Sequence, residues 1–177
     1  MQRKPFLLSI NCQKCPLCKT RVHIVIGRGP LTATTLVIGE APGKTEDVLG
    51  QAFIGDSGKL LDTLLCRAGI DPQDCYFTNT VLCRPCDSRD GENREPTEQE
   101  IFLCLDNVLK TINCLQNIHG IVFAGKIAKK WYAARLKGLP QCYIIHPAAL
   151  LRQGGAASSH YLDAVNILKE FKRVLNP

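Results

Sequence analysis

Four cysteines in this sequence have the residue type and spacing of a ligand set for a metal centre. Cys12 and Cys15 form a C-x-x-C pair near the N-terminus. Cys83 follows a strand-like run, and Cys104 lies within a predicted helix. One close pair with two remote cysteines is a usual arrangement around a 4Fe–4S cluster. Zinc is the alternative, because four thiolates also bind structural zinc and the C-x-x-C pair fits both.

The other cysteines of the ten are not predicted to be ligands. Cys18 and Cys86 lie close to the predicted ligands in sequence, whereas the rest lie in apolar runs, where a thiol is a small core side chain. The apolar stretch at residues 6–10 is too short for a secretory signal, which favours a cytoplasmic protein with few disulfides. The cysteines in apolar runs are Cys66, Cys75, Cys114 and Cys142.

Polar or small residues follow each predicted strand. Gly39 and Glu40 come after the first strand, and Asn79 lies near the end of the second. Gly125 and His146 follow the two later strands. In parallel sheets, ligands bind beyond the carboxyl ends of the strands. We therefore expect these residues to converge on one pocket.

The elements that must position these residues alternate between strands and helices. This alternation predicts a mostly parallel sheet with helices on both faces. Thr97 and Glu100 form the pattern of a capping box at the start of one helix. Residues 46–51 are a poor helix start, and no helix is predicted there. The predicted strands are residues 36–38, 75–82, 121–124 and 142–145, and the predicted helices are residues 57–68, 97–113, 126–136 and 159–175.

Length and charge limit the classes of protein. A chain of 177 residues is long enough for one domain, residues 1–177, with a sizeable core. The net charge of +6 suits a polyanionic partner. No apolar run is long enough to span a bilayer, so no membrane association is expected.

The segment at residues 39–45 is similar to a phosphate-binding loop but departs from it. That motif needs four residues between its first glycine and the Gly-Lys pair, whereas only three separate Gly39 from Gly43 here. Pro42 also removes one backbone N–H from the loop. Nucleoside triphosphate binding is therefore disfavoured.

Short motifs with one family's order and spacing cover almost the whole chain. They lie at residues 12–17, 39–43, 46–47, 52–55, 57–62, 78–79, 83–85, 93–94 and 146–152. Together they resemble the family 4 uracil-DNA glycosylases, the iron–sulfur class of bacteria and archaea. The resemblance implies an α/β fold, a three-layer α/β/α sandwich around a central, mostly parallel four-stranded sheet. It also implies a 4Fe–4S cluster on Cys12, Cys15, Cys83 and Cys104.

The resemblance implies that a uracil base is flipped out of DNA into a tight pocket. Asn79 would pair with O4 and N3–H of uracil, and Phe53 would stack on the base. Backbone amides of the Glu40–Ala41 loop would bind the carbonyl oxygens, Gly39 would also contact the base, and Glu46 would crowd the C5 position of thymine. Without the resemblance, Asn79 is a turn residue and Phe53 a core residue.

Two residues are expected to carry bond cleavage. His146 resembles the family's partner of uracil O2, where a hydrogen-bond donor stabilises the charge that develops on the leaving base. Glu40 would organise water and the sugar side of the site. The best-known uracil glycosylases have a water-orienting aspartate at the position of Ala41, and family 4 members commonly lack it. Structural roles remain the alternatives for both residues.

The DNA contacts implied by the resemblance follow His146. Leu150 would wedge into the base stack, and Arg152 would bind a phosphate. The alternative is that Leu150 and Leu151 form a buried helix start. Residues 86–92 are an insertion relative to typical members, and the segment at residues 126–141 is shorter than usual.

Three functions remain open at this point. The resemblance implies a monomeric enzyme of base excision repair that excises uracil from single- or double-stranded DNA. The alternatives are a glycosylase of the same fold for another modified pyrimidine, or a non-catalytic module that binds DNA or a partner. Fold alone does not separate these three.

Overall fold

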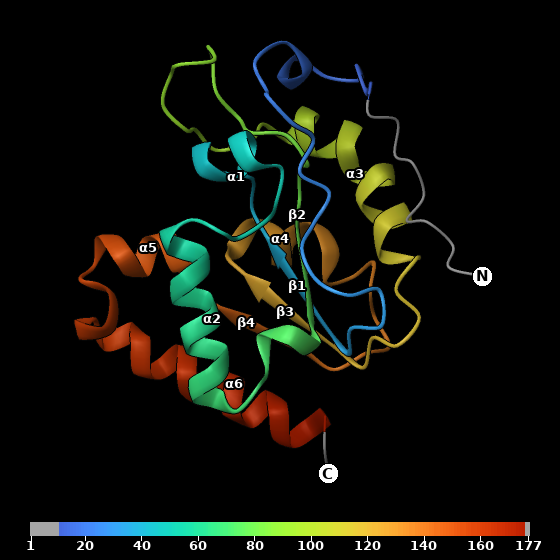
Figure 1. Ribbon diagram of the computed structural model, residues 1–177. Helices are drawn as coiled ribbons and strands as arrows, with labels where there is room; N and C mark the ends of the chain where they lie inside the picture. The colour runs from blue at the N-terminus through green and yellow to red at the C-terminus, as the bar shows by residue number, and fades with distance from the viewer. Residues whose placement is uncertain (1–10, 176–177) are drawn as a thin grey trace.

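The centre of the molecule is a parallel sheet of four strands in the order β2-β1-β3-β4 (Figure 1). The structure is a computed structural model that describes residues 11–175, so the apolar stretch at residues 6–10 lies outside the described residues. All three strand pairings are parallel, which confirms the predicted type of sheet. The strands are β1 (Thr35–Gly39), β2 (Cys75–Asn79), β3 (Gly120–Ala124) and β4 (Gln141–Ile144).

Helices cover both faces of this sheet, which confirms the predicted three-layer architecture. One face is covered by α2 and α6, and the other by α3 and α4 (Figure 1). The α-helices are α1 (Lys44–Leu49), α2 (Asp56–Ala68), α3 (Glu98–Ile112), α4 (Lys126–Tyr132), α5 (Pro147–Arg152) and α6 (Ser159–Leu175), and the 3₁₀ helices are η1 (Pro16–Lys19), η2 (Pro72–Asp74) and η3 (Gly155–Ala157).

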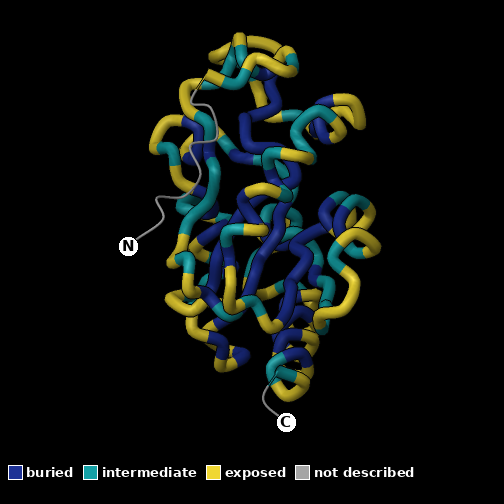
Figure 2. Tube along the Cα trace, turned by 90° about the vertical axis from the view of Figure 1, so that its right-hand side faces the viewer, coloured by how far each residue is buried: buried dark blue, intermediate teal, exposed yellow. Residues whose placement is uncertain are grey.

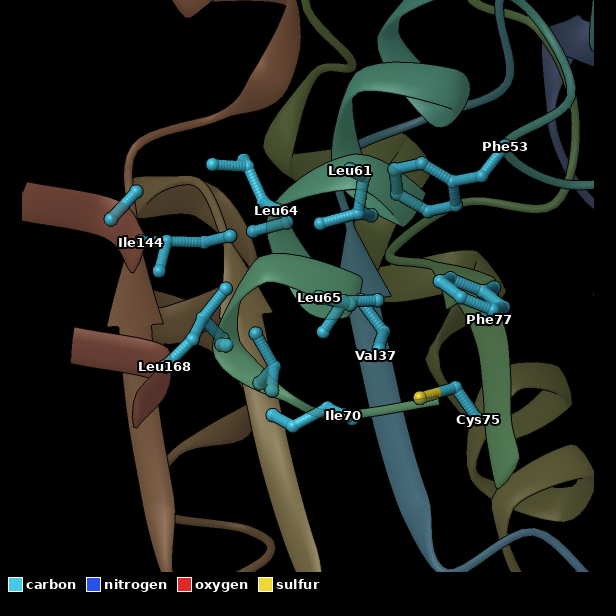
Figure 3. Close-up of a cluster of buried hydrophobic side chains, with 14 of the residues drawn as sticks. Val37, Phe53, Leu61, Leu64, Leu65, Ile70, Cys75, Phe77, Ile144 and Leu168 are labelled. Atoms are coloured by element: carbon cyan, nitrogen blue, oxygen red, sulfur yellow. The ribbon is translucent and has the colours of Figure 1, made fainter. Parts of the chain in front are cut away.

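Alternation along the strands divides the core into two clusters. In β1, Val37 packs against the α2 and α6 layer, whereas Leu36 and Ile38 pack on the α3 and α4 side. Figure 3 shows Val37, Leu61 and Leu168 within the first cluster. β1, β2 and β3 are buried along their whole length, as expected when helices cover a parallel sheet, whereas the edge strand β4 is only partly buried (Figure 2).

Local sequence signals set several helix ends as predicted. Thr97 caps α3 by accepting a hydrogen bond from the Glu100 backbone N–H, and the Glu100 carboxylate accepts one from the Thr97 backbone N–H. This confirms the predicted capping box. At the C-terminal end of α2, Gly69 adopts a left-handed conformation with φ of 78° and terminates the helix.

Three predicted boundaries are wrong. The strand predicted for residues 75–82 ends at Asn79, because the backbone N–H groups of Thr80 and Val81 donate to the carbonyls of Gly39 and Glu40 in the neighbouring loop. The helix after Gly125 ends at Tyr132 rather than near residue 136. Residues 44–49 form a short helix, α1, in the region where no helix was predicted.

Within residues 11–175, no helix is long and apolar enough to cross a bilayer.

Candidate active site and cysteine cavity

A cavity of about 310 Å³ lies beyond the carboxyl ends of the strands. Glu40, Asn79 and His146 all line it, which confirms the expectation that these strand ends converge. Gly125 contributes indirectly, because a Cβ atom there would lie 3.2 Å from Cδ2 of His146. The other predicted site residues that line the cavity are Ala41, Glu46, Phe53 and Arg152.

His146 lines this cavity and has an unpaired hydrogen-bond donor. Its Nδ1 accepts a hydrogen bond of 3.2 Å from the backbone N–H of Ala148 at the start of α5. Nδ1 therefore carries no proton, and the proton of the neutral ring is on Nε2. Nε2 is buried and has no partner. Burial lowers the pKa of His146 to about 4, with a smaller contribution from the positive charge of Arg152, so the ring is neutral at physiological pH.

Asn79 lines the same cavity and has an unpaired acceptor. The side chain is 2% exposed, and its Oδ1 is buried without a partner. Gly39 lies beside it in the sheet, and a Cβ atom at Gly39 would be 2.6 Å from Asn79 Oδ1 and 2.3 Å from Phe53 Cζ. A side chain at position 39 would therefore displace Asn79, Phe53 or both.

Phe53 lies between the hydrophobic core and the cavity. Its ring is 5.8 Å from the ring of Phe77 and 6.4 Å from that of His146, measured between centroids. Figure 3 shows the ring at the edge of the core cluster near Phe77. The backbone of Phe53 has φ of 55°, a conformation that is rare for a bulky side chain and is seen at functional sites whose surroundings enforce it.

The carboxylate of Glu46 holds the loop that carries Phe53. Its Oε1 accepts hydrogen bonds from the backbone N–H of Ile54 at 3.1 Å and of Gly55 at 2.7 Å. Glu46 is 7% exposed, so these charge-assisted bonds are formed largely out of water. They fix the two residues that follow the strained Phe53.

Glu40 projects from the loop after β1 and is partly buried. Burial raises the pKa of its carboxyl group, and the nearby charge of Glu95 raises it further, while Lys126 and Arg152 oppose the change. The Glu40 carbonyl accepts hydrogen bonds from the Thr80 hydroxyl and the Val81 backbone N–H. The loop that contains Glu40 and Ala41 is thus attached to the segment after β2.

The predicted wedge residue is not at the surface. Leu150 is fully buried in the core cluster that includes α2 and α6, so in this structure it is not available to contact DNA. The reason is the helix α5, which turns Leu150 inward and leaves the adjacent Leu151 40% exposed. Arg152, at the end of the same helix, is exposed beside the cavity.

The longer loop at residues 86–92 is ordered by a buried arginine. Arg84 is 2% exposed and donates hydrogen bonds to Oδ1 of Asn93 at 2.5 Å and to the carbonyls of Arg89 and Gly91. The amide of Asn93 lines the cavity and was not predicted as a site residue. Residues 93–94 are one of the motifs of the family resemblance, but no role was predicted for Asn93. Ser57, Arg94 and Glu95 also line the cavity and were not predicted.

The four predicted ligand cysteines line a second cavity. Cys12, Cys15, Cys83 and Cys104 all contribute to its wall, whereas Cys18 and Cys86 do not. In residues 11–175, no group of three or more His, Cys, Asp or Glu side chains is arranged around a position for a single metal ion.

Nitrogen donors surround the sulfur atoms of this cavity. Cys83 Sγ accepts a hydrogen bond from Arg21 at 3.6 Å, Cys12 Sγ accepts one from Asn107 at 3.6 Å, and Cys104 Sγ accepts one from the Leu82 backbone N–H at 3.4 Å. Burial raises the pKa of the Cys83 thiol to about 11 and of the Cys104 thiol to about 12. As free thiols they would be protonated at neutral pH, whereas the N–H donors suit thiolates.

Comparison with known proteins gives a consistent result. A family model described as the uracil DNA glycosylase superfamily matches residues 26–169. The type-4 uracil-DNA glycosylase of Pyrobaculum aerophilum is 34% identical over 163 residues, which cover 81% of each chain. That of Thermotoga maritima is 35% identical over 157 residues, covering 80% of this chain and 79% of the relative. That of Archaeoglobus fulgidus is 37% identical, covering 69% of this chain and 58% of the relative.

The family match spans all four strands of the sheet, the loops that follow them and every residue that lines the first cavity, so fold and sequence similarity agree over the same residues. The chain belongs to the uracil-DNA glycosylase superfamily and, within it, to the type-4 family.

Proposed function

We propose that this chain excises uracil from DNA by hydrolysing the N-glycosidic bond of a flipped nucleotide, as part of base excision repair. One observation carries the proposal beyond family membership. Asn79 and His146 both line the cavity, and Oδ1 of Asn79 and Nε2 of His146 are buried without a hydrogen-bond partner. Buried polar groups are rarely left unpaired, and a pyrimidine with complementary edges would satisfy both.

Asn79 would read the Watson–Crick edge of the base. Its Oδ1 would accept from N3–H of uracil and its amide N–H would donate to O4. Cytosine has an amino group in place of O4 and no proton on N3, so the same amide orientation would oppose it. Phe53 would stack on the base, and backbone N–H groups of Gly39 and Ala41 would bind its carbonyl oxygens. Glu46 would support this loop and crowd a thymine methyl group.

His146 would stabilise the leaving uracil anion. Its neutral Nε2–H would donate to O2, where negative charge develops as the glycosidic bond breaks. The low pKa of His146 fits this role, because the ring is a donor without being charged. Glu40 would organise the attacking water on the sugar side, from its position at the edge of the cavity.

Cys12, Cys15, Cys83 and Cys104 would hold a 4Fe–4S cluster. The shared cavity and the N–H donors to three of the sulfurs support this ligand set. The cluster would supply structural cross-linking of the N-terminal segment, the loop after β2 and α3.

The DNA strand would cross the open side of the cavity. Arg152 would bind a phosphate there, and Leu151, which is exposed where Leu150 is buried, would enter the base stack. The substrate would be uracil-containing DNA, single- or double-stranded. We also propose that the protein consists of one domain, is monomeric and acts in the cytoplasm.

Uracil release from oligonucleotides with one U, one T or one modified pyrimidine tests this function. Wild-type protein should release uracil from U-containing strands, and His146→Ala should lower the single-turnover rate by about 10²–10³-fold with DNA binding nearly intact. Release of another pyrimidine in preference to uracil would favour the alternative function, a glycosylase of the same fold for a modified pyrimidine. DNA binding without release of any base would favour a non-catalytic module.

A further inference from the structure

The short helix α1 is anchored by carboxylates instead of apolar side chains. Glu46 and Asp47 are 7% and 1% exposed, whereas Val48 and Leu49 are 52% and 62% exposed. A helix of this length is marginal by itself in water, so its position depends on tertiary contacts. Adjacent residues in an α-helix point about 100° apart, so the two carboxylates reach different neighbours.

Asp47 attaches α1 to the N-terminal segment. Its Oδ1 accepts hydrogen bonds from the backbone N–H of Val22 at 2.9 Å and of His23 at 3.3 Å. The Asp47 carbonyl is also 2.9 Å from Nδ1 of the His23 ring. Three contacts therefore fix residues 22 and 23 on α1.

The segment held by Asp47 leads directly to the cysteine cavity. Arg21, the residue before Val22, donates to Cys83 Sγ at 3.6 Å and to the Cys12 carbonyl at 2.8 Å, and it lines that cavity. Val22 and His23 are therefore connected to Cys12 and Cys83 through the peptide bond to Arg21 and the hydrogen bonds of Arg21.

Glu46 connects the same helix to the cavity that Asn79 and His146 line. Its Oε1 holds the N–H groups of Ile54 and Gly55, which follow Phe53. The left-handed backbone of Phe53 needs enforcement by its surroundings, and these two bonds supply part of it. α1 is thus hydrogen-bonded both to the segment that follows Arg21 and to the loop that carries Phe53.

We propose that Asp47 is a positioning residue that couples the cysteine cavity to the Phe53 loop through α1. Loss of its carboxylate would free α1 from the N-terminal segment, and Glu46 would then hold Ile54 and Gly55 less firmly. Its meaning for catalysis rests on the proposed function, but the mechanical link does not.

Amide hydrogen exchange of the purified, iron-loaded protein tests the link without any activity measurement. Asp47→Ala should speed exchange at Ile54 and Gly55 by about tenfold, with iron per chain and exchange within β1 and β3 unchanged. Asp47→Asn keeps an oxygen acceptor and should restore the wild-type rates. Asp62→Ala is the matched control, because Asp62 binds Arg28 of the same N-terminal segment from α2 instead of α1. It should leave Ile54 and Gly55 unchanged.

Coupling is reciprocal, which gives a second test if Asp47→Ala does not fold. Glu46→Ala should speed exchange at Val22 and His23, which Glu46 does not contact. The proposal is overturned if Asp47→Ala frees Val22 and His23 alone, if Asp62→Ala has the same effect as Asp47→Ala, or if Glu46→Ala leaves Val22 and His23 unchanged. Absence of uracil release by the wild-type protein would reject the proposed function and leave this link intact.

Discussion

Asn79 and His146 line one cavity, and each has a buried polar atom without a partner, an acceptor on Oδ1 of Asn79 and a donor on Nε2 of His146. They come from the ends of β2 and β4, the two outer strands of the sheet, which are separated by β1 and β3. The parallel arrangement of the strands brings both residues to the same edge. A site that recognises one edge of a base and stabilises charge on a different edge needs two such residues at the same cavity.

The low pKa of His146 predicts acid sensitivity of stability. In the folded state the pKa is about 4, below the ordinary 6.5, so as pH falls from 6.5 to 4 the unfolded chain gains a proton that the folded chain does not. Unfolding is therefore favoured by acid in this window, and the effect is absent above it. Between about pH 7.5 and about pH 5 the contribution of His146 should fall by about 2 kcal/mol.

Denaturant unfolding of the wild type and of His146→Gln at both pH values measures this contribution. The stability difference between the two proteins should shift against the wild type as pH falls. Glu40 does not confuse the comparison, because its raised pKa is present in both proteins. An equal stability loss in both would mean that His146 titrates normally.

Arg152→Ala should weaken DNA binding and reduce its salt dependence. One lost phosphate contact should lower the slope of log K against log salt concentration by about 0.9 for duplex DNA. Fluorescence anisotropy at several salt concentrations measures the slope. Lys169→Ala on α6, also exposed but remote from the cavity lining, should leave the slope unchanged. A slope unchanged in Arg152→Ala would remove this residue from the DNA contact.

Leu150 and Leu151 should respond differently to truncation. Leu150→Ala should destabilise the fold by about 2–5 kcal/mol, because it removes a fully buried side chain. Leu151→Ala should leave the melting temperature nearly unchanged and slow uracil release from duplex more than from single-stranded DNA, which has no stack to fill. Equal effects of Leu151→Ala on both substrates would reject the wedge role.

Cys15→Ser should reduce the iron content, whereas Cys18→Ser should not. Cys15 lines the shared cysteine cavity, and Cys18, in the same segment, does not. Iron and acid-labile sulfide analysis, with the absorbance of the brown protein, gives the comparison. Stoichiometric zinc without iron in the wild type would contradict the cluster and favour the alternative that the C-x-x-C pair left open.

The sequence predicts the layers of this fold well, because the apolar runs and the Thr97–Glu100 capping box act locally. It fails for α1, because buried carboxylates and tertiary hydrogen bonds hold that helix where no apolar pattern exists. It also selects the wrong leucine for the surface. Spacing from His146 favours Leu150, whereas packing against α2 and α6 determines which side of α5 is turned towards the core.

Part of the site is predictable for a similar reason. Residues at strand ends, such as Asn79 and His146, are predicted by position in a parallel sheet. Asn93 is not, because its place at the cavity depends on Arg84, a buried arginine whose hydrogen bonds order a polar loop. No local pattern in that loop indicates which of its polar side chains faces inward.

Uracil release by Asn79→Asp tests the central claim most directly. A carboxylate keeps an acceptor but loses the amide donor for O4, so the site would hold an unpaired or repelled group against uracil. Single-turnover release from U-containing DNA should fall by at least about 10²-fold. Near-equal iron content, melting temperature and DNA affinity in the variant and the wild type would show that only base reading has changed. Wild-type rates of uracil release by Asn79→Asp would contradict the account, because another group would then read the base.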